Sequence, residues 1–150
     1  MITKLKKRRV LVFGNTGFVG SWLSLSLNLF GANVLGVSLK MKNNNYLSNT
    51  IQFKKNVNTI YCNIHNLNKI KKRIDNFRPE IIVHLASQPL VSDAYKNPKK
   101  TFNTNIMGTL EILEFIKNLK SLKKIIIFTS DKVYKNDHQK LNEDSKLGGI

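Results

Sequence analysis

The fold of this chain is decided by the stretch Val10-Leu11-Val12-Phe13-Gly14-Asn15-Thr16-Gly17-Phe18-Val19-Gly20. The four apolar residues at its start predict a buried strand, and the residues from Phe18 onward predict the first turn of a helix. Glycines at positions 14, 17 and 20 let the backbone bend sharply and approach a phosphate without an intervening Cβ. A helix N-terminus adds unpaired N–H groups and a positive dipole end. The stretch therefore predicts a dinucleotide-binding turn, spaced G-x-x-G-x-x-G.

Apolar spacing outside this turn predicts strands that alternate with helices. The expected strands cover residues 10–13, 33–39, 59–64, 80–86 and 124–129. The expected helices cover residues 18–30 and 66–77, with a long helix from residue 97 to about residue 116. The asparagine-rich residues 40–58 are expected to form a loop. This alternation predicts an α/β fold, a Rossmann-like, doubly wound parallel sheet in three α/β/α layers, with the pattern ending after the fifth strand.

The expected helices carry predictions about their ends and their inward faces. Gly31 is expected to stop the first helix, Asn66 to cap the second, and Pro79 to follow its end. In the first helix the apolar stripe consists of Val19, Trp22, Leu23, Ser26, Leu27 and Phe30. In the long helix the residues expected to face inward are Phe102, Ile106, Leu110, Leu113 and Ile116.

Length and composition limit the class of protein. A chain of 150 residues fits one domain, covering residues 1–150, and is long enough to bury a core. The single cysteine, Cys62, excludes a disulfide framework and suits a reducing compartment. No apolar run is long enough to span a membrane, and the basic start lacks the pattern of a signal peptide. We therefore expect a cytoplasmic protein without a membrane partner.

The formal net charge of +16 raises the question of a nucleic-acid partner. The excess is mostly lysine, it is scattered along the whole chain, and it accompanies abundant Asn and Ile. A general drift in composition explains such a distribution better than a binding surface does. We therefore expect no nucleic-acid partner.

Polar residues follow the last two expected strands, at the edge where sheets of this kind bind ligands. Four segments, in order along the chain, resemble the CDP-glucose 4,6-dehydratases, which belong to the extended short-chain dehydrogenase/reductase family of NAD-dependent epimerases and dehydratases. These segments are residues 17–23, 84–91, 101–109, and 130–132 together with 147–149. The discriminating features are Trp22 and Ser130-Asp131-Lys132, where the dTDP-glucose relatives have Thr-Asp-Glu.

The resemblance implies NAD as the cofactor, CDP-glucose as the substrate and a homodimer in the full-length form. Hydride would leave C4 of the sugar for NAD, water would be lost across C5 and C6, and the hydride would return to C6. Ser130 would hydrogen-bond O4, Asp131 would protonate the departing C6 hydroxyl, and Lys132 would take or relay the C5 proton. The alternative for these three residues is an ordinary polar turn after a strand.

The resemblance also implies a set of cofactor-binding residues and no metal ligands. The set is Gly14, Asn15, Thr16, Gly17, Phe18, Val19, Gly20, Ser38, Asn63, Ile64, Leu85, Ala86, Ser87, Gln88, Asn105 and Thr129. Asn105 would bridge to the backbone of the active site, or else would face solvent on its helix. Of the other reactive side chains, His84 is interpreted as a hydrogen-bonded core histidine, Cys62 as a small hydrophobic residue, and His65 and His138 as surface residues.

Two departures from the family pattern leave alternatives open. Ser38 stands where an acidic residue usually binds the adenine ribose, and Lys40 and Lys42 follow, so NADP remains an alternative to NAD. The Tyr-x-x-x-Lys pair of the superfamily would come after the last residue. We therefore expect this to be the cofactor-binding part of the enzyme, inactive alone and prone to associate through its last strand. The alternatives are another nucleotide-sugar epimerase or dehydratase, and a non-catalytic dinucleotide-binding module.

Overall fold

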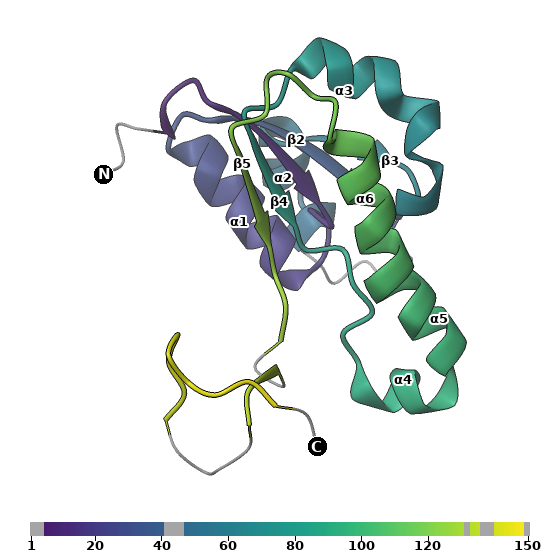
Figure 1. Cartoon of the computed structure of the whole chain (residues 1–150). Helices are drawn as coiled ribbons and strands as arrows, with labels where there is room; N and C mark the ends of the chain where they lie inside the picture. The colour runs from purple at the N-terminus through teal and green to yellow at the C-terminus, as the bar shows by residue number, and fades with distance from the viewer. Residues whose placement is uncertain (1–4, 41–46, 131–132, 136–139, 149–150) are drawn as a thin grey trace.

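The computed structural model of the chain describes residues 5–40, 47–130, 133–135 and 140–148. A five-stranded parallel sheet of order β3-β2-β1-β4-β5 forms its centre (Figure 1). The strands are β1 (Arg9–Phe13), β2 (Asn33–Ser38), β3 (Asn58–Tyr61), β4 (Ile81–His84) and β5 (Lys124–Ile127). The predicted Rossmann-like, doubly wound sheet is therefore confirmed, although β3, β4 and β5 are shorter than expected.

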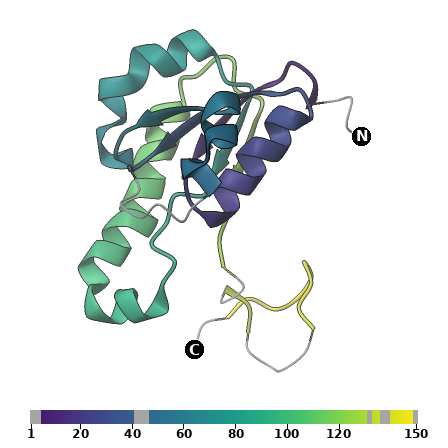
Figure 2. The same cartoon turned by 180° about the vertical axis from the view of Figure 1, so that it is seen from behind.

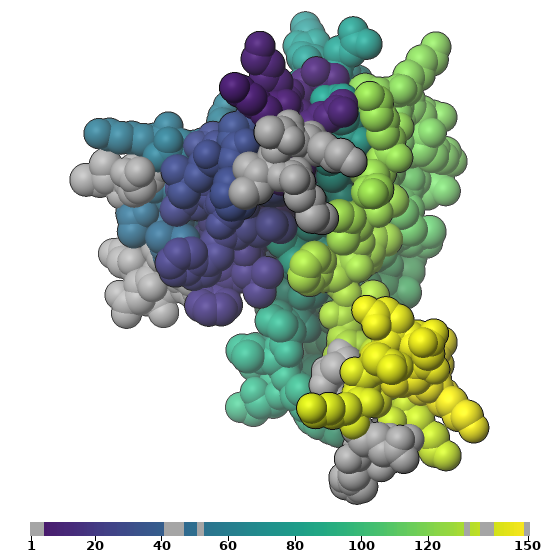
Figure 3. Space-filling model, turned by 90° about the vertical axis from the view of Figure 1, so that its left-hand side faces the viewer, coloured from purple at the N-terminus to yellow at the C-terminus, as the bar shows by residue number. Residues whose placement is uncertain are grey.

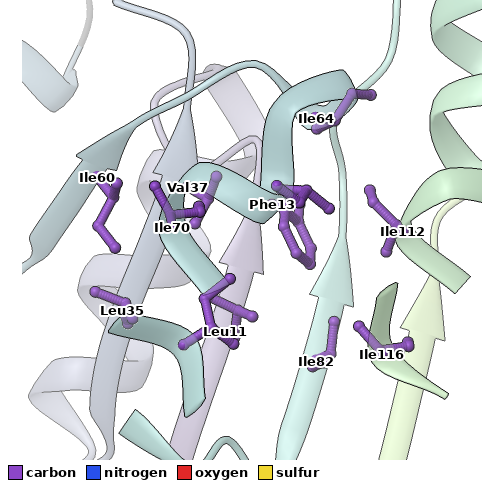
Figure 4. Close-up of a cluster of buried hydrophobic side chains, with 12 residues drawn as sticks. Leu11, Phe13, Leu35, Val37, Ile60, Ile64, Ile70, Ile82, Ile112 and Ile116 are labelled. Carbon is purple, nitrogen blue, oxygen red and sulfur yellow. The ribbon is translucent and has the colours of Figure 1, made fainter. Parts of the chain in front are cut away.

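Helices cover both faces of the sheet. On one face lie α1 (Phe18–Leu29) and α2 (Ile51–Asn56), seen in front of the sheet in Figure 2. On the other face lie η3 (Ile64–Ile70), α3 (Lys71–Phe77) and α6 (Gly108–Ile116). Because side chains alternate along a strand, Val10 and Val12 enter the first layer, whereas Leu11 and Phe13 enter the second (Figure 4). Two separate apolar clusters thus bury most of β1, β2 and β4, whereas the edge strand β5 is largely exposed, including Ile126 and Ile127.

The long helix contains a change of helical pitch. It begins with α5 (Pro98–Phe102), continues as η4 (Asn103–Met107), a single π-helical segment, and ends with α6. Figure 1 shows this helix extending past the carboxyl ends of the strands, where α4 (Val91–Lys96) precedes it. The sequence pattern did not predict α4. Within the described residues, no helix is both long and apolar enough to cross a membrane.

The expected loop at residues 40–58 is partly helical, so that prediction was wrong. It contains η2 (Leu47–Asn49) and α2, whose first turn is capped by the Thr50 side chain, which accepts from the N–H of Phe53. Phe53 is buried against the sheet. One buried aromatic residue and one N-cap organise a stretch that is otherwise too polar to show helical periodicity.

The predicted apolar stripe of the first helix is confirmed in part, and the predicted inward face of the long helix was largely wrong. In α1, Leu23 and Leu27 pack against the core and Ser26 is half-buried. Trp22 is 55% exposed, Val19 and the C-cap residue Phe30 are also exposed, and the fully buried positions include Gly20 and Ser24. Small side chains let this helix approach the sheet closely. In the long helix, only Ile116 of the expected inward residues is buried. The exposed ones are Phe102, Ile106, Leu110 and Leu113.

The alternative row on the long helix consists of Gly108, Ile112 and Ile116, and these residues face the sheet. A Cβ on Gly108 would lie 2.3 Å from Ile64 Cδ1, so this helix also depends on a small residue at its closest approach. Two apolar rows on one helix have the same spacing, and their periodicity alone does not indicate which row is buried.

The predicted helix ends are mostly confirmed. Gly31 has φ +82° and follows α1, as expected for a residue at a helix stop. The helix before Pro79 ends at Phe77, and Arg78 adopts the left-handed conformation. The predicted side-chain cap was wrong, because the Asn63 side chain accepts from the N–H of His65 at the start of η3. Asn66 has non-helical dihedral angles, φ −126° and ψ 28°, and lies at a kink within η3. The sequence pattern allows either Asn63 or Asn66 to cap this helix. The path of the backbone after β3 decides that Asn63 does so.

Residues 133–135 and 140–148 follow β5 and are coloured lime to yellow in Figure 3; residues 133–135 pair antiparallel with residues 146–148. Tyr134 pairs with Leu147, and the N–H of Lys135 donates to the carbonyl of Lys146 at 2.9 Å. The sequence pattern did not predict this pairing.

A cluster of charges joins three strands at the amino end of the sheet. The carboxylate of Glu80, which is nearly buried, accepts from Arg8 Nη1 at 2.8 Å, from the N–H of Arg9 at 3.3 Å and from Lys123 Nζ at 3.2 Å. The backbone N–H of Arg9 and the side chains of Arg8 and Lys123 lower the pKa of Glu80 to about 2.

We expect Glu80→Gln to destabilise the fold at neutral pH. Because the pKa of Glu80 is lower in the folded than in the unfolded protein, its contribution is present above about pH 4.5 and is lost as the pH falls toward 2. The difference in unfolding free energy between Glu80→Gln and the parent should therefore vanish near that lower pH. Urea unfolding across this range measures it. Glu114→Gln, which removes an exposed carboxylate paired with Lys117, is the control and should change little.

Candidate dinucleotide site

Two of the three glycines in the turn after β1 are required by the packing of the protein itself. Gly14 has φ +84°, and a Cβ there would lie 2.7 Å from the backbone nitrogen of Ala86. A Cβ on Gly20 would lie 2.1 Å from the carbonyl oxygen of Gly14. These glycines let the loop after β4 and helix α1 close around the turn.

Gly17 differs from the other two glycines. Its backbone has φ −69° and ψ 176°, which any residue adopts. A Cβ built on it meets only the carbonyl oxygen of Gly14, at 3.4 Å, among the atoms of the described residues. The packing of the protein therefore does not explain why residue 17 is a glycine. A ligand that approaches the turn from outside would explain it, because a side chain at this position would occupy its space.

The N-terminus of α1 offers hydrogen-bond donors at the same place. Gly17 is its N-cap, and no side chain in the described part of the chain caps this helix. Its first turn carries no acidic residue, and Phe18 and Val19 are exposed. The first N–H groups of a helix lack partners within the helix, and the helix dipole favours an anion there. The geometry suits a phosphate group.

The side chains of Asn15 and Thr16 point into the protein. Asn15 is fully buried, and its Nδ2 donates to Thr59 Oγ1 at 2.8 Å. The backbone N–H of Thr16 donates to Ser38 Oγ at 3.2 Å, and the Thr16 carbonyl accepts from Ser48 Oγ at 3.0 Å. These side chains fix the shape of the turn against β2 and β3.

Sequence reasoning missed Ser48 and the role of Gly36. A Cβ on Gly36 would lie 2.0 Å from the side chain of Asn15, so the glycine in the middle of β2 makes room for that asparagine. A glycine inside a strand indicates a close approach, and this signal was available in the sequence. No sequence signal points to Ser48, which reaches the turn from η2.

The loops that follow the strands meet at the carboxyl edge of the sheet. The N–H of Leu85 donates to the carbonyl of Phe13 at 2.9 Å, and the N–H of Phe128 donates to the carbonyl of His84 at 3.0 Å. The loop after β4 borders the glycine turn, because atoms of Leu85 and Ala86 lie within 3.0 Å of where a Cβ on Gly14 would stand. Thr129 follows β5, which lies on the other side of β4 from β1. Asn63 is exposed at its cap, whereas the side chain of Ile64 is buried in the core.

Asn105 of the π-helical segment reaches the loop after β4. Its Oδ1 accepts from the N–H of Gln88 at 2.7 Å, and its Nδ2 donates to the carbonyl of Gln88 at 3.1 Å. This pair of hydrogen bonds fastens the loop to the long helix.

The expected catalytic residues lie at the end of β5. Ser130 is exposed. Asp131 and Lys132 lie outside the described residues, as does His138.

Two other reactive side chains are held by neighbours. His65, predicted to be a surface residue, is partly exposed, and its Nδ1 lies 3.0 Å from Glu111 Oε1 while its Nε2 lies 3.2 Å from Asn103 Nδ2. Cys62 is half-buried, and burial raises the pKa of its thiol. Within the described ranges, no three His, Cys, Asp or Glu side chains form a group that could hold a metal ion.

A parallel sheet with a glycine turn and an uncapped helix N-terminus defines a Rossmann-like nucleotide-binding fold. Residues 11–148 match the family model described as GDP-mannose 4,6 dehydratase, and the chain belongs to this family. Its relatives include the CDP-glucose 4,6-dehydratase of Salmonella typhimurium, which is 40% identical over 129 residues. The UDP-glucose 4-epimerase of Mycoplasma genitalium is 25% identical over 128 residues. The matches cover 86% and 85% of this chain but only 36% and 37% of those proteins.

Solved structures share the fold. An epimerase from Methanothermobacter thermautotrophicus superposes with a TM-score of 0.82 and 26% identity, over 98% of this chain and 43% of that one. The UDP-glucose 4-epimerase of Stenotrophomonas maltophila, solved with NAD bound, superposes with a TM-score of 0.83 and 19% identity, over 95% of this chain and 43% of that one. The chain thus spans less than half the length of these proteins.

Proposed function

We propose that this chain is the NAD-binding part of a nucleotide-sugar 4,6-dehydratase that acts on CDP-glucose and is a homodimer in its full-length form. The observation that carries the proposal is Gly17, the one glycine of the turn at which the protein itself leaves room for a side chain. Membership of the family and the likeness to the Salmonella enzyme favour a dehydratase.

The residues around the turn fit NAD. The pyrophosphate would lie against Gly17 and the first N–H groups of α1, and the nicotinamide side would lie near the loop after β4. When bound, NAD supplies the hydride acceptor. Ser130 would hydrogen-bond O4 of the sugar, where charge develops.

The elimination would be carried by the two residues that follow. Asp131 would give a proton to the departing C6 hydroxyl, and Lys132 would take the proton from C5. A lysine acts as a base only when its pKa is lowered by burial or by nearby positive charge. These roles rest on the resemblance of residues 130–132 to the family motif.

NAD is preferred over NADP in this proposal, although Ser38 replaces an acidic residue at the end of β2. The Ser38 side chain is buried and accepts from the N–H of Thr16, so it supports the turn. Among the described residues, the nearest basic side chain along the chain is the exposed Lys40. Calorimetric titration with both dinucleotides compares them, and tighter binding of NADP would overturn the choice of NAD.

We expect Gly17→Val to weaken NAD binding by at least about tenfold, equivalent to ~1.4 kcal/mol. The new side chain projects from the turn toward the space that the pyrophosphate would occupy, while the backbone keeps an ordinary conformation. Calorimetry on the variant and the parent measures the two affinities, and urea unfolding checks that both are folded. Equal affinities would contradict the placement of the pyrophosphate.

A further inference from the structure

A chain of hydrogen bonds leads from the core to the loop after β4, and it begins at His84. This histidine is buried at the end of β4 with its ring edge-on to Phe13. Its Nε2 lies 2.9 Å from Oγ1 of Thr109, and Thr109 Oγ1 lies 2.7 Å from the carbonyl oxygen of Asn105. Burial lowers the pKa of His84 and so favours the neutral ring.

The direction of these hydrogen bonds follows from counting protons. A hydroxyl has one proton, and the Asn105 carbonyl can only accept, so Thr109 donates its proton there. Thr109 Oγ1 must then accept from Nε2–H of His84. This assigns the proton of the neutral ring to Nε2 and leaves Nδ1, which has no partner among the described residues, as an unprotonated nitrogen.

The other end of the chain of hydrogen bonds is the backbone of Gln88, which Asn105 holds through both its N–H and its carbonyl. The Gln88 side chain continues to Asp93 Oδ2 at 2.9 Å. Asn105 lies in the π-helical segment, and such wide turns inside helices frequently occur at functional sites. Figure 1 shows the loop running from β4 to α4 beside the long helix.

We propose that His84 and Thr109 are positioning residues that act through Asn105 to hold the loop at residues 85–90 in the shape that receives the nicotinamide side of the cofactor. Neither residue touches the ligand in this arrangement. Thr109 fixes the Asn105 carbonyl and with it the turn that presents the Asn105 side chain to Gln88. The cofactor part of this inference rests on the proposed function.

Two variants of Thr109 separate a positioning role from simple packing. Thr109→Val keeps the shape of the side chain and removes the hydroxyl, whereas Thr109→Ser keeps the hydroxyl and removes a methyl group. Amide hydrogen exchange without ligand reports on the loop directly. In Thr109→Val we expect the Gln88 amide to exchange at least about tenfold faster relative to the Leu85 amide, which pairs with β1. In Thr109→Ser the ratio should stay near that of the parent.

Calorimetric titration with NAD and with ADP supplies the second readout. ADP carries the adenosine and the pyrophosphate but no nicotinamide, so it does not reach the loop at residues 85–90. Thr109→Val should therefore weaken NAD binding by at least about fivefold and leave ADP binding unchanged. Equal Gln88 protection in both variants, or equal loss of NAD and ADP affinity, would overturn the inference. Failure of the parent to bind either nucleotide would instead overturn the proposed function, and with it the cofactor role of the loop. The exchange ratio would still decide whether Thr109 positions Gln88.

Discussion

Gly20→Ala is expected to destabilise the protein by at least about 2 kcal/mol, the scale of overpacking a close contact. The added Cβ would lie 2.1 Å from the Gly14 carbonyl oxygen and 2.9 Å from Asn15 Cα. Both atoms belong to the backbone, so no side chain can rotate away, and α1 must move off the turn. In an exposed helix the same change stabilises by about 1 kcal/mol, so the sign of the effect tests the packing. Urea unfolding measures the loss of unfolding free energy, and the dependence of that free energy on urea concentration should be the same in the variant and the parent.

The matched control for this prediction is Gly17→Ala, three residues earlier in the same turn. Its Cβ meets the protein only at 3.4 Å, and its backbone is not strained, so stability should change by less than about 0.5 kcal/mol. If the two variants have equal free energies of unfolding, α1 does not lie as close to the glycine turn as the structure shows.

In the full-length protein, Lys132→Ala is expected to slow the elimination of water by ~100- to 10,000-fold, the usual contribution of a general acid or base. The first oxidation of the sugar should be affected far less, because it does not involve the C5 proton. Single-turnover mixing would therefore show reduced cofactor accumulating while the 4-keto-6-deoxy product forms slowly.

Lys120→Ala is the control for the loss of a positive charge, since Lys120 is exposed in the turn before β5. It should leave both steps unchanged. A Lys132→Ala protein that releases product at the parental rate would remove Lys132 from the mechanism. An equal slowing of both steps would point instead to a role in binding the sugar nucleotide.

The sequence by itself determined the strands, the glycine turn and their order, because these depend on local signals. Continuous apolar runs such as Ile81–His84 predict buried parallel strands, and glycines at 14, 17 and 20 predict the turn. The bridging role of Asn105 was implied by the family resemblance and not by local signals, and the structure shows its side chain hydrogen-bonded to the backbone of Gln88.

Only the tertiary structure decided which helix faces are buried and what each site residue does. The long helix has apolar rows on two sides, and the buried row is the one in which Gly108 lies against Ile64 of η3. The three glycines of the turn cannot be told apart from the sequence, yet only Gly17 has room for a side chain. The difference depends on neighbouring atoms that the fold brings to Gly14 and Gly20. For the same reason, the link from His84 through Thr109 to Asn105 was not predictable. Thr109 and Asn105 are four residues apart on one helix, but His84 is 21 or more residues from both along the chain. Only the packing of the long helix beside the end of β4 brings His84 to Thr109.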